Sequence, residues 1–226
     1  MNFIKKYLLK DMLTLVLLLG LIFSGFLMAE PRLGMAIEDQ FTITQTITSE
    51  ISFATTAADV TMTPSLGGLT GGTSNGTTTV VVVTNDSSGY TMTIKASSSP
   101  AMQGNTQGGS VADYTQASTY VPDFTFSVPT GEEFGYSVSA STTADLAQKF
   151  LDNGSDTCNT GSADTSGTAS CWYSLSTTAT STIFRSSETT VYGSTSSVYF
   201  KLRINSGSAV PEDTYVATTT LTATTN

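Results

Sequence analysis

TTTVVVVTNDSSGYTMTIKASS, at residues 77–98, carries the clearest structural signal in this 226-residue chain. Its first part is a short, continuous apolar run, which is typical of a strand buried in the core of a β-sandwich. Its last part alternates, with Tyr90, Met92 and Ile94 on one face and Lys95 on the other, which predicts a half-buried strand. Because NDSSG between them has turn chemistry, we expect residues 77–98 to form a β-hairpin.

Apolar residues recur with a period of two along most of the chain, between turns rich in Gly, Ser and Asn. Strands at this spacing predict an all-β fold, an antiparallel β-sandwich of the immunoglobulin-like or jelly-roll-like kind. Its other predicted strands lie at residues 41–53, 124–128, 134–140, 198–204 and 215–223, with one more inside 172–184.

One short helix is expected within this domain, at residues 142–154, TTADLAQKFLDNG. Thr142 or Thr143 could cap its start, and Gly154 could end it. Leu146 and Phe150 are four residues apart, so they would share one face of the helix.

The chain begins with an apolar leader. Three lysines precede residues 12–28, which are almost wholly apolar, and small residues follow. This is the layout of a secretory signal, with Ala29 or Ala36 at the cleavage site. We therefore expect residues 1–36 to be a signal peptide and a hydrophobic signal helix, and residues 37–226 to form a single domain.

Two other interpretations of the leader remain open. An uncleaved leader would be a membrane anchor through residues 7–28, the chain's only expected contact with a membrane. Processing after Lys6 would instead make Asp11 the fifth residue of an exposed apolar helix. That arrangement resembles the N-terminus of a type IV pilin, in which an acid at this position helps assembly, although those leaders normally end in Gly.

The composition of residues 37–226 excludes several functions. Five basic residues face sixteen acidic ones, a net charge of −11, and Ser and Thr dominate. Nucleic acid is disfavoured because phosphate binding needs clustered Lys and Arg, whereas an acidic surface suits an extracellular or cell-surface protein. The chain has no histidine, which removes histidine-dependent nucleophiles and the usual zinc hydrolase sites. We expect neither an enzyme nor a cofactor.

Cys158 and Cys171 are the only cysteines. In an exported protein they have one intramolecular pairing, so we expect a disulfide that closes the polar loop between them. A loop of this size is stabilised by roughly 3 kcal/mol in the chain-entropy model. Trp172, the only tryptophan, is placed to pack on this bridge.

Other polar motifs have ordinary structural explanations. The adjacent carboxylates Glu132 and Glu133 lie in a turn context, as does the pair Glu212 and Asp213, and both pairs are expected to be solvated rather than opposed across a cleft. No metal site is expected. Asp152 and Asp156 in DNGSD are the one candidate pair for Ca²⁺, although no glutamate closes the loop. Three Asn-x-Ser/Thr matches in predicted loops are candidate glycosylation sites: Asn75, Asn85 and Asn153.

Two segments carry a resemblance to known families. AVPEDTYVATTTLTAT, at residues 209–224, resembles the closing strand of secreted bacterial β-sandwich proteins, and VVVVTNDSSGYTMTIKAS, at residues 80–97, resembles an early hairpin in them. The families are the spore-coat-U-like and fimbrial subunits and the WxL-type surface proteins. The chain lacks a Trp-x-Leu motif and a Leu-Pro-x-Thr-Gly sorting signal. The resemblance implies a subunit of a surface or filament structure.

FTITQTITSEISF, at residues 41–53, is the candidate assembly strand. An apolar strand near a free N-terminus either joins its own sheet or completes a neighbour's sheet by strand addition, and the second option builds a filament. We therefore expect an extracellular structural or adhesive protein that self-associates into filaments or a cell-surface polymer. The apolar face of the strand comprises Phe41, Ile43, Ile47, Ile51 and Phe53.

A secreted carbohydrate-binding module is the alternative function. Such modules stack sugars on exposed aromatic rings, and Tyr114, Tyr120 and Tyr173 are the candidates. A clustered, exposed row of these rings would favour this alternative.

Overall fold

The computed structural model describes residues 2–28, 38–164 and 170–226. They form two compact units, Met1–Thr46 and Ile47–Asn226. The first unit contains helix α1 (Asn2–Met28) followed by an extended segment from residue 38. None of the described helices combines the length and apolar character that a membrane crossing needs.

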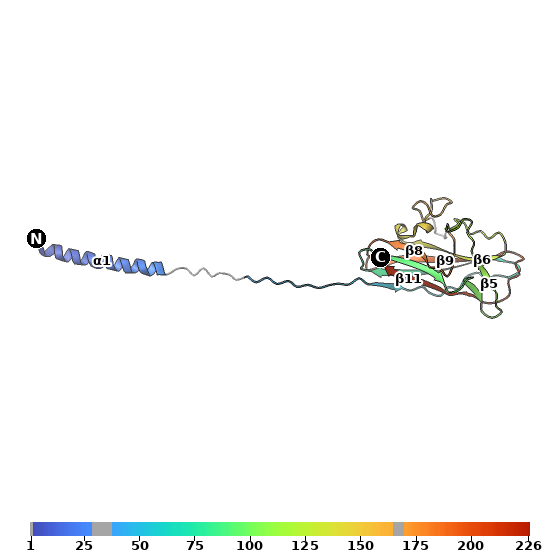
Figure 1. Ribbon diagram of the computed structural model, residues 1–226, viewed down its shortest axis with the longest axis horizontal. Coiled ribbons are helices and arrows are strands. Elements are labelled where there is room, and N and C mark those ends of the chain that lie inside the picture. The colour runs from blue at the N-terminus through green and yellow to red at the C-terminus, as the bar shows by residue number, and fades with distance from the viewer. Residues whose placement is uncertain (1, 29–37, 165–169) are drawn as a thin grey trace. The chain divides into compact units, whose positions relative to one another are not determined.

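The second unit is mostly β, with eleven strands in two sheets among its described residues (Figure 1). The strands are β1 (Ile51–Thr55), β2 (Gly72–Thr84), β3 (Tyr90–Ala96), β4 (Met102–Gly104), β5 (Ser110–Asp113), β6 (Glu132–Ala140), β7 (Tyr173–Ser174), β8 (Thr180–Arg185), β9 (Ser194–Ile204), β10 (Tyr215–Ala217) and β11 (Thr219–Thr225). The larger sheet has the order β1-β2-β9-β6-β5-β4-β10, with β7 paired to β6. The smaller sheet has the order β11-β3-β8.

The hairpin predicted at residues 77–98 is wrong. Both strands form, but β2 pairs with β1 and β9, while β3 pairs with β11 and β8 in the other sheet. Val82 of β2 and Met92 of β3 are fully buried in the same core cluster. Both strands are rich in apolar residues. More apolar surface is therefore buried when the two strands lie on opposite sides of one core than when they lie side by side in one sheet.

Gly89 makes the connection between β2 and β3 feasible. Its φ is +78°, a conformation that side chains disfavour, and a Cβ at this position would lie 2.1 Å from the carbonyl oxygen of Arg185. Its N–H donates to the carbonyl of Asp86, which closes the turn at 3.0 Å. The turn predicted at NDSSG is therefore confirmed, although the strands that it connects belong to two different sheets.

The predicted helix at residues 142–154 is also wrong. The segment contains two 3₁₀ turns, Thr143–Asp145 and Gln148–Phe150, and Thr142 makes no capping side-chain bond. Between the turns, Leu146 forms a bridge with Ile183 of β8, and the N–H of Ala147 donates to the carbonyl of Thr182 at 2.9 Å. This pairing takes the backbone groups that a helix would use, so tertiary contacts override local propensity.

Other strand predictions need smaller corrections. Residues 124–128 form no strand, although Phe126 and Val128 are buried in a second cluster that also contains Trp172. Two strands, β7 and β8, replace the single one expected within residues 172–184. The closing strand divides between the sheets, because β10 pairs with β4 and β11 pairs with β3.

One strand pair departs from the antiparallel arrangement expected from the sequence. β5 and β6 are parallel, with Ala112 opposite Glu133. The remaining strand pairs of the described residues are antiparallel, including the long β2–β9 pair that runs from Gly72–Ile204 to Val82–Ser194. The prediction that this part of the chain consists mainly of β-strands is confirmed.

Candidate functional site

The candidate assembly strand at residues 41–53 is a strand only from Ile51 onward. Ile51 and Phe53 are half-buried against the core cluster, on the face that the alternation predicts. Residues 41–50 have no strand partner. Phe41, Ile43 and Ile47 are 82%, 84% and 83% exposed. The apolar face read from the sequence is therefore divided between a docked part and an exposed part.

Asn85 holds the chain where it enters β1. The N–H of Glu50 donates to Asn85 Oδ1 at 2.7 Å, and Asn85 Nδ2 donates to the carbonyl of Thr48 at 3.1 Å. Thr84 Oγ1 also donates to the carbonyl of Glu50 at 2.7 Å. These bonds, which we call the Asn85 contacts, fix the backbone of residues 48–50 against the end of β2.

β1 is an edge strand of the larger sheet. The N–H of Asn85 donates to the carbonyl of Glu50, so even-numbered residues direct their backbone groups toward β2. Ile51 and Phe53 consequently present N–H and C=O to the open side. The register shifts between Phe53 and Thr55, so the regular part of this edge is short.

β11 is an edge strand of the smaller sheet, and its open side is longer. The N–H of Ser97 donates to the carbonyl of Thr218 at 2.9 Å, and the N–H of Asn226 donates to the carbonyl of Gly89 at 3.2 Å. Even-numbered residues therefore bond to β3, and odd-numbered residues direct their backbone groups outward. The outward residues are Thr219, Leu221, Ala223 and Thr225.

The core is incompletely covered along both edges. Ile51 and Phe53 of β1 and Leu221 and Ala223 of β11 all pack against the core cluster, yet all four remain half-buried. β1 and β11 lie close to each other across the two sheets. An added strand beside either edge would cover apolar surface that is now in contact with water.

The predicted disulfide is present. Cys158 and Cys171 are joined at 2.04 Å, with their Cα atoms 5.6 Å apart, and both residues are buried. Trp172 does not join the core cluster that holds the cysteines. It packs edge-on against Phe126 at 5.2 Å between ring centroids, and Lys201 Nζ lies 4.2 Å from its ring centroid.

Each carboxylate pair contains a residue that accepts hydrogen bonds from backbone N–H groups. Glu133 accepts a bond from the N–H of Thr115 at 3.3 Å, and partial burial raises the pKa of its carboxyl. Asp213 accepts bonds from the N–H groups of Thr106 and Gln107; desolvation works to raise its pKa, but these donors together lower it. The charge of Asp123 adds to the rise in the pKa of Glu133.

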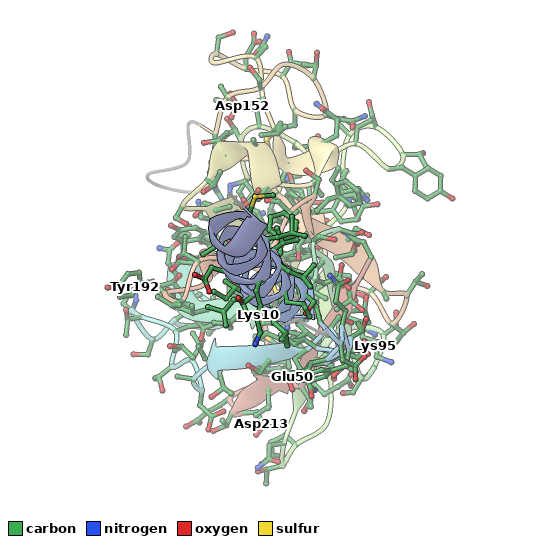
Figure 2. All side chains as sticks on the ribbon, turned by 90° about the vertical axis from the view of Figure 1, so that its left-hand side faces the viewer. Lys10, Glu50, Lys95, Asp152, Tyr192 and Asp213 are labelled. Carbon is green, nitrogen blue, oxygen red and sulfur yellow. A yellow bond between two sulfur atoms is a disulfide. The ribbon has the colours of Figure 1, made fainter. Side chains whose placement is uncertain are left out.

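The Ca²⁺ candidates Asp152 and Asp156 do not belong to a cluster of three or more metal-ligating side chains within the described residues. Asp152 is fully buried, and its Oδ1 accepts a bond from the N–H of Gly154 at 2.7 Å. Hydrogen bonds from Thr157, then Asn153 and Ser155, lower the pKa of Asp156. Asp152 and Asp213 lie on opposite sides of the β unit (Figure 2), so these two acidic motifs do not converge.

The glycosylation candidates have different environments. Asn75 lies within β2, not in the predicted loop, and its backbone pairs with Thr63. Asn85 is in the turn after β2, where its amide makes the Asn85 contacts. Asn153 is exposed, and its Oδ1 accepts a bond from the N–H of Ser155 at 3.1 Å.

The three candidate tyrosines do not form an exposed row. Tyr114 is buried and stacks on Phe126 at 4.5 Å between ring centroids, whereas Tyr173 is half-buried under Lys149. Tyr120 alone is exposed, at 77%. The arrangement that would favour a sugar-binding platform is therefore absent from these residues.

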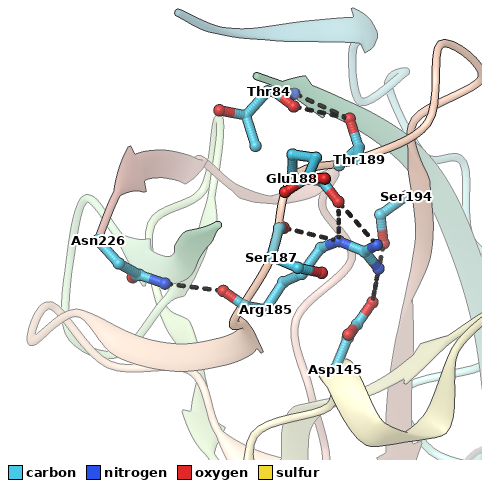
Figure 3. Close-up of polar contacts among 8 residues, drawn as sticks. All are labelled: Thr84, Asp145, Arg185, Ser187, Glu188, Thr189, Ser194 and Asn226. Carbon is cyan, nitrogen blue, oxygen red and sulfur yellow. Dashed lines mark hydrogen bonds and ion pairs between the residues drawn. The ribbon is translucent and has the colours of Figure 1, made fainter. Parts of the chain in front are cut away.

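One ion pair is found among the described residues, and its role is structural. Arg185 Nη1 lies 2.6 Å from Asp145 Oδ2, and both side chains are largely buried. Arg185 Nε donates to the carbonyls of Ser187 and Glu188, and Nη2 donates to the carbonyl of Glu188 (Figure 3). This network fixes the loop after β8 to the first 3₁₀ turn.

Comparisons with models of known protein families, with curated proteins and with solved structures found no match to this chain. The candidate site is therefore supported by the geometry of this chain alone. The Asn85 contacts and the open edge of β11 were not predicted from the sequence. The signals for them were the asparagine after the valine run and the charge-free C-terminal segment 214–226.

Proposed function

We propose that this chain is an extracellular structural or adhesive surface protein whose β-sandwich domain associates with further copies through residues 41–53. The observation that carries the proposal is the exposure of Phe41, Ile43 and Ile47 immediately before an edge strand. Burial of each of these large apolar side chains is favourable by about 1.5–3 kcal/mol, so their exposure favours association with another surface.

The mode of association follows from the strand pattern. A segment of period two adds to a sheet edge, where main-chain bonds supply affinity and one face of side chains is buried. Such a contact joins two different surfaces of identical subunits, so it repeats into an open chain of copies unless the geometry closes. The disulfide supports an oxidising, extracellular compartment for this assembly.

The test compares the full chain with two matched variants, all kept in detergent because α1 is apolar. Ile43→Asp places a charge on the apolar face, and Thr44→Asp places the same charge on the opposite face. Light scattering and negative-stain microscopy report assembly. We expect Ile43→Asp to weaken self-association by roughly a hundredfold and Thr44→Asp to have a much smaller effect.

Two results would contradict the proposal. A wild-type chain that stays monomeric at every concentration would remove it. Equal effects of the two variants would show that added charge, and not burial of the apolar face, controls association.

A further inference from the structure

We propose that the surface that receives residues 41–47 is the open edge of β11 in a second copy of this chain. This inference rests on the proposed function, because it names the acceptor for the self-association described there. Four candidate edges are present in the described sheets: β1, β10, β11 and β8. β10 has only three residues, which is too short for a donor of seven. Backbone geometry, charge and side-chain pattern each distinguish between them.

Backbone geometry favours β11. Its seven residues are paired to β3 without a register shift, so Thr219, Leu221, Ala223 and Thr225 direct their N–H and C=O groups outward at regular intervals. β1 presents only Ile51 and Phe53 before its register shift. β8 is already partly covered, since Ala147 N–H bonds to its Thr182 carbonyl. Residues 41–47 match β11 in length.

Charge also favours β11. Residues 214–226 contain no charged side chain, and Lys95 of β3 is exposed directly opposite Thr220. The donor segment is flanked by acidic residues, Glu38 and Asp39 before it and Glu50 after it. An approach to β1 would bring these acids toward a second Glu50, whereas an approach to β11 brings them toward a lysine. Natural edge strands usually carry charges that prevent such pairing, and β11 has none.

The side-chain patterns of donor and acceptor agree. In β11, Leu221 and Ala223 face the core, and Thr220, Thr222 and Thr224 form the exposed face. In the donor, Phe41, Ile43 and Ile47 share one face, and threonines share the other. Placed side by side, the two strands bury their apolar faces together and continue a threonine surface, and cross-strand Thr pairs are favourable.

The local sequence disfavours a fold-back of the donor onto its own chain. Folding back would need a turn between Ile47 and Ile51, and this stretch contains neither glycine nor proline. The Asn85 contacts hold the backbone of Thr48 and Glu50 against the end of β2. A second copy is therefore the occupant that the local structure allows.

Disulfide trapping tests the acceptor. One full-length population carries Thr44→Cys, and the other carries a cysteine on the exposed face of β11, at Thr220, Thr222 or Thr224 in turn. Because opposite Cβ atoms of paired strands lie within about 5.5 Å, one of the three should cross-link under mild oxidation. Ser52→Cys, on the exposed face of β1, is the matched control.

Each outcome discriminates. Cross-links to β11 and not to Ser52→Cys support the inference. Cross-links to Ser52→Cys, or assemblies that link to neither edge, overturn it while leaving the proposed function intact. Absence of any assembly in the unmodified chain removes both.

A second variant tests the edge without cysteines. Ala223→Pro removes an outward N–H and leaves the bonds to β3 in place, as proline on an edge strand permits. We expect self-association to weaken about tenfold, because one strand-to-strand hydrogen bond is lost and the carbonyl that would accept it is left unpaired. Unchanged assembly by a folded variant would overturn the inference, and if the variant does not fold, the trapping result decides.

Discussion

Glu50 and Asn85, 35 residues apart in the sequence, are joined by a 2.7 Å hydrogen bond from the Glu50 N–H to Asn85 Oδ1. The same amide group donates to the carbonyl of Thr48. One side chain thus sets where the exposed segment ends and where β1 begins. A docked edge strand and an exposed apolar segment can lie next to each other because this junction is fixed.

Asn85→Ala should loosen the start of β1. Loss of two hydrogen bonds at an exposed site predicts a fall of about 1 kcal/mol in the free energy of unfolding. Amide hydrogen exchange at Glu50 should become faster than in the parent chain, while exchange in β9 should not change. Asn75→Ala, which removes an exposed asparagine from β2, is the control. Unchanged protection at Glu50 would contradict this role for Asn85.

Asp145→Ala should be the more damaging change. It leaves the guanidinium of Arg185 without its carboxylate in a largely buried position, which typically costs about 3–5 kcal/mol. Chemical denaturation measures the loss. The double variant Asp145→Ala/Arg185→Met should recover part of it, because no unpaired charge remains. A loss below about 0.5 kcal/mol would show that the pair is solvated in solution.

Asp113 should give a pH-dependent contribution to stability. Desolvation raises the pKa of its carboxyl above the ordinary 3.8, despite bonds from the Ala101 N–H and the Ser99 hydroxyl. The folded state therefore holds this proton more tightly than the unfolded state. The contribution of Asp113 is most favourable below its ordinary pKa, and it declines as pH rises through the folded-state pKa.

Asp113→Asn isolates this effect, because an amide oxygen can still accept the bond from Ala101. The free energy of unfolding of the parent minus that of the variant is measured across acidic pH. This difference should fall as pH rises from about 3.8. A difference that is flat with pH, or that rises, would contradict the raised pKa.

Replacing both cysteines by serine should lower stability by about 3 kcal/mol, as expected for a bridge with a sequence separation of 13. Thermal unfolding with and without a reductant provides the measurement. The reductant should destabilise the parent chain and leave the double-serine variant unchanged. If the reductant had no effect on the parent chain, the bridge would not contribute to stability.

Side-chain alternation was enough to predict β3, β6, β9 and β11, including the inward faces of Ile94, Val138 and Val198. Alternation is a local property, because successive side chains of any strand point to opposite faces. The disulfide could be predicted as well, since two cysteines allow one pairing. The strand at residues 41–50 could not be corrected from sequence, because an alternating pattern does not reveal whether a partner strand is present.

Only the tertiary structure decided which strands pair. β2 and β3 were expected to be neighbours because they are adjacent in the chain, yet a shared core placed Val82 and Met92 on opposite sheets. The predicted helix gave way to a bridge between Leu146 and Ile183, a partner far along the chain. The open edge of β11 likewise depends on the order of strands in its sheet. Local sequence determined the two faces of each strand, and long-range burial determined the neighbour of each strand, because a strand's backbone bonds are made only with another segment.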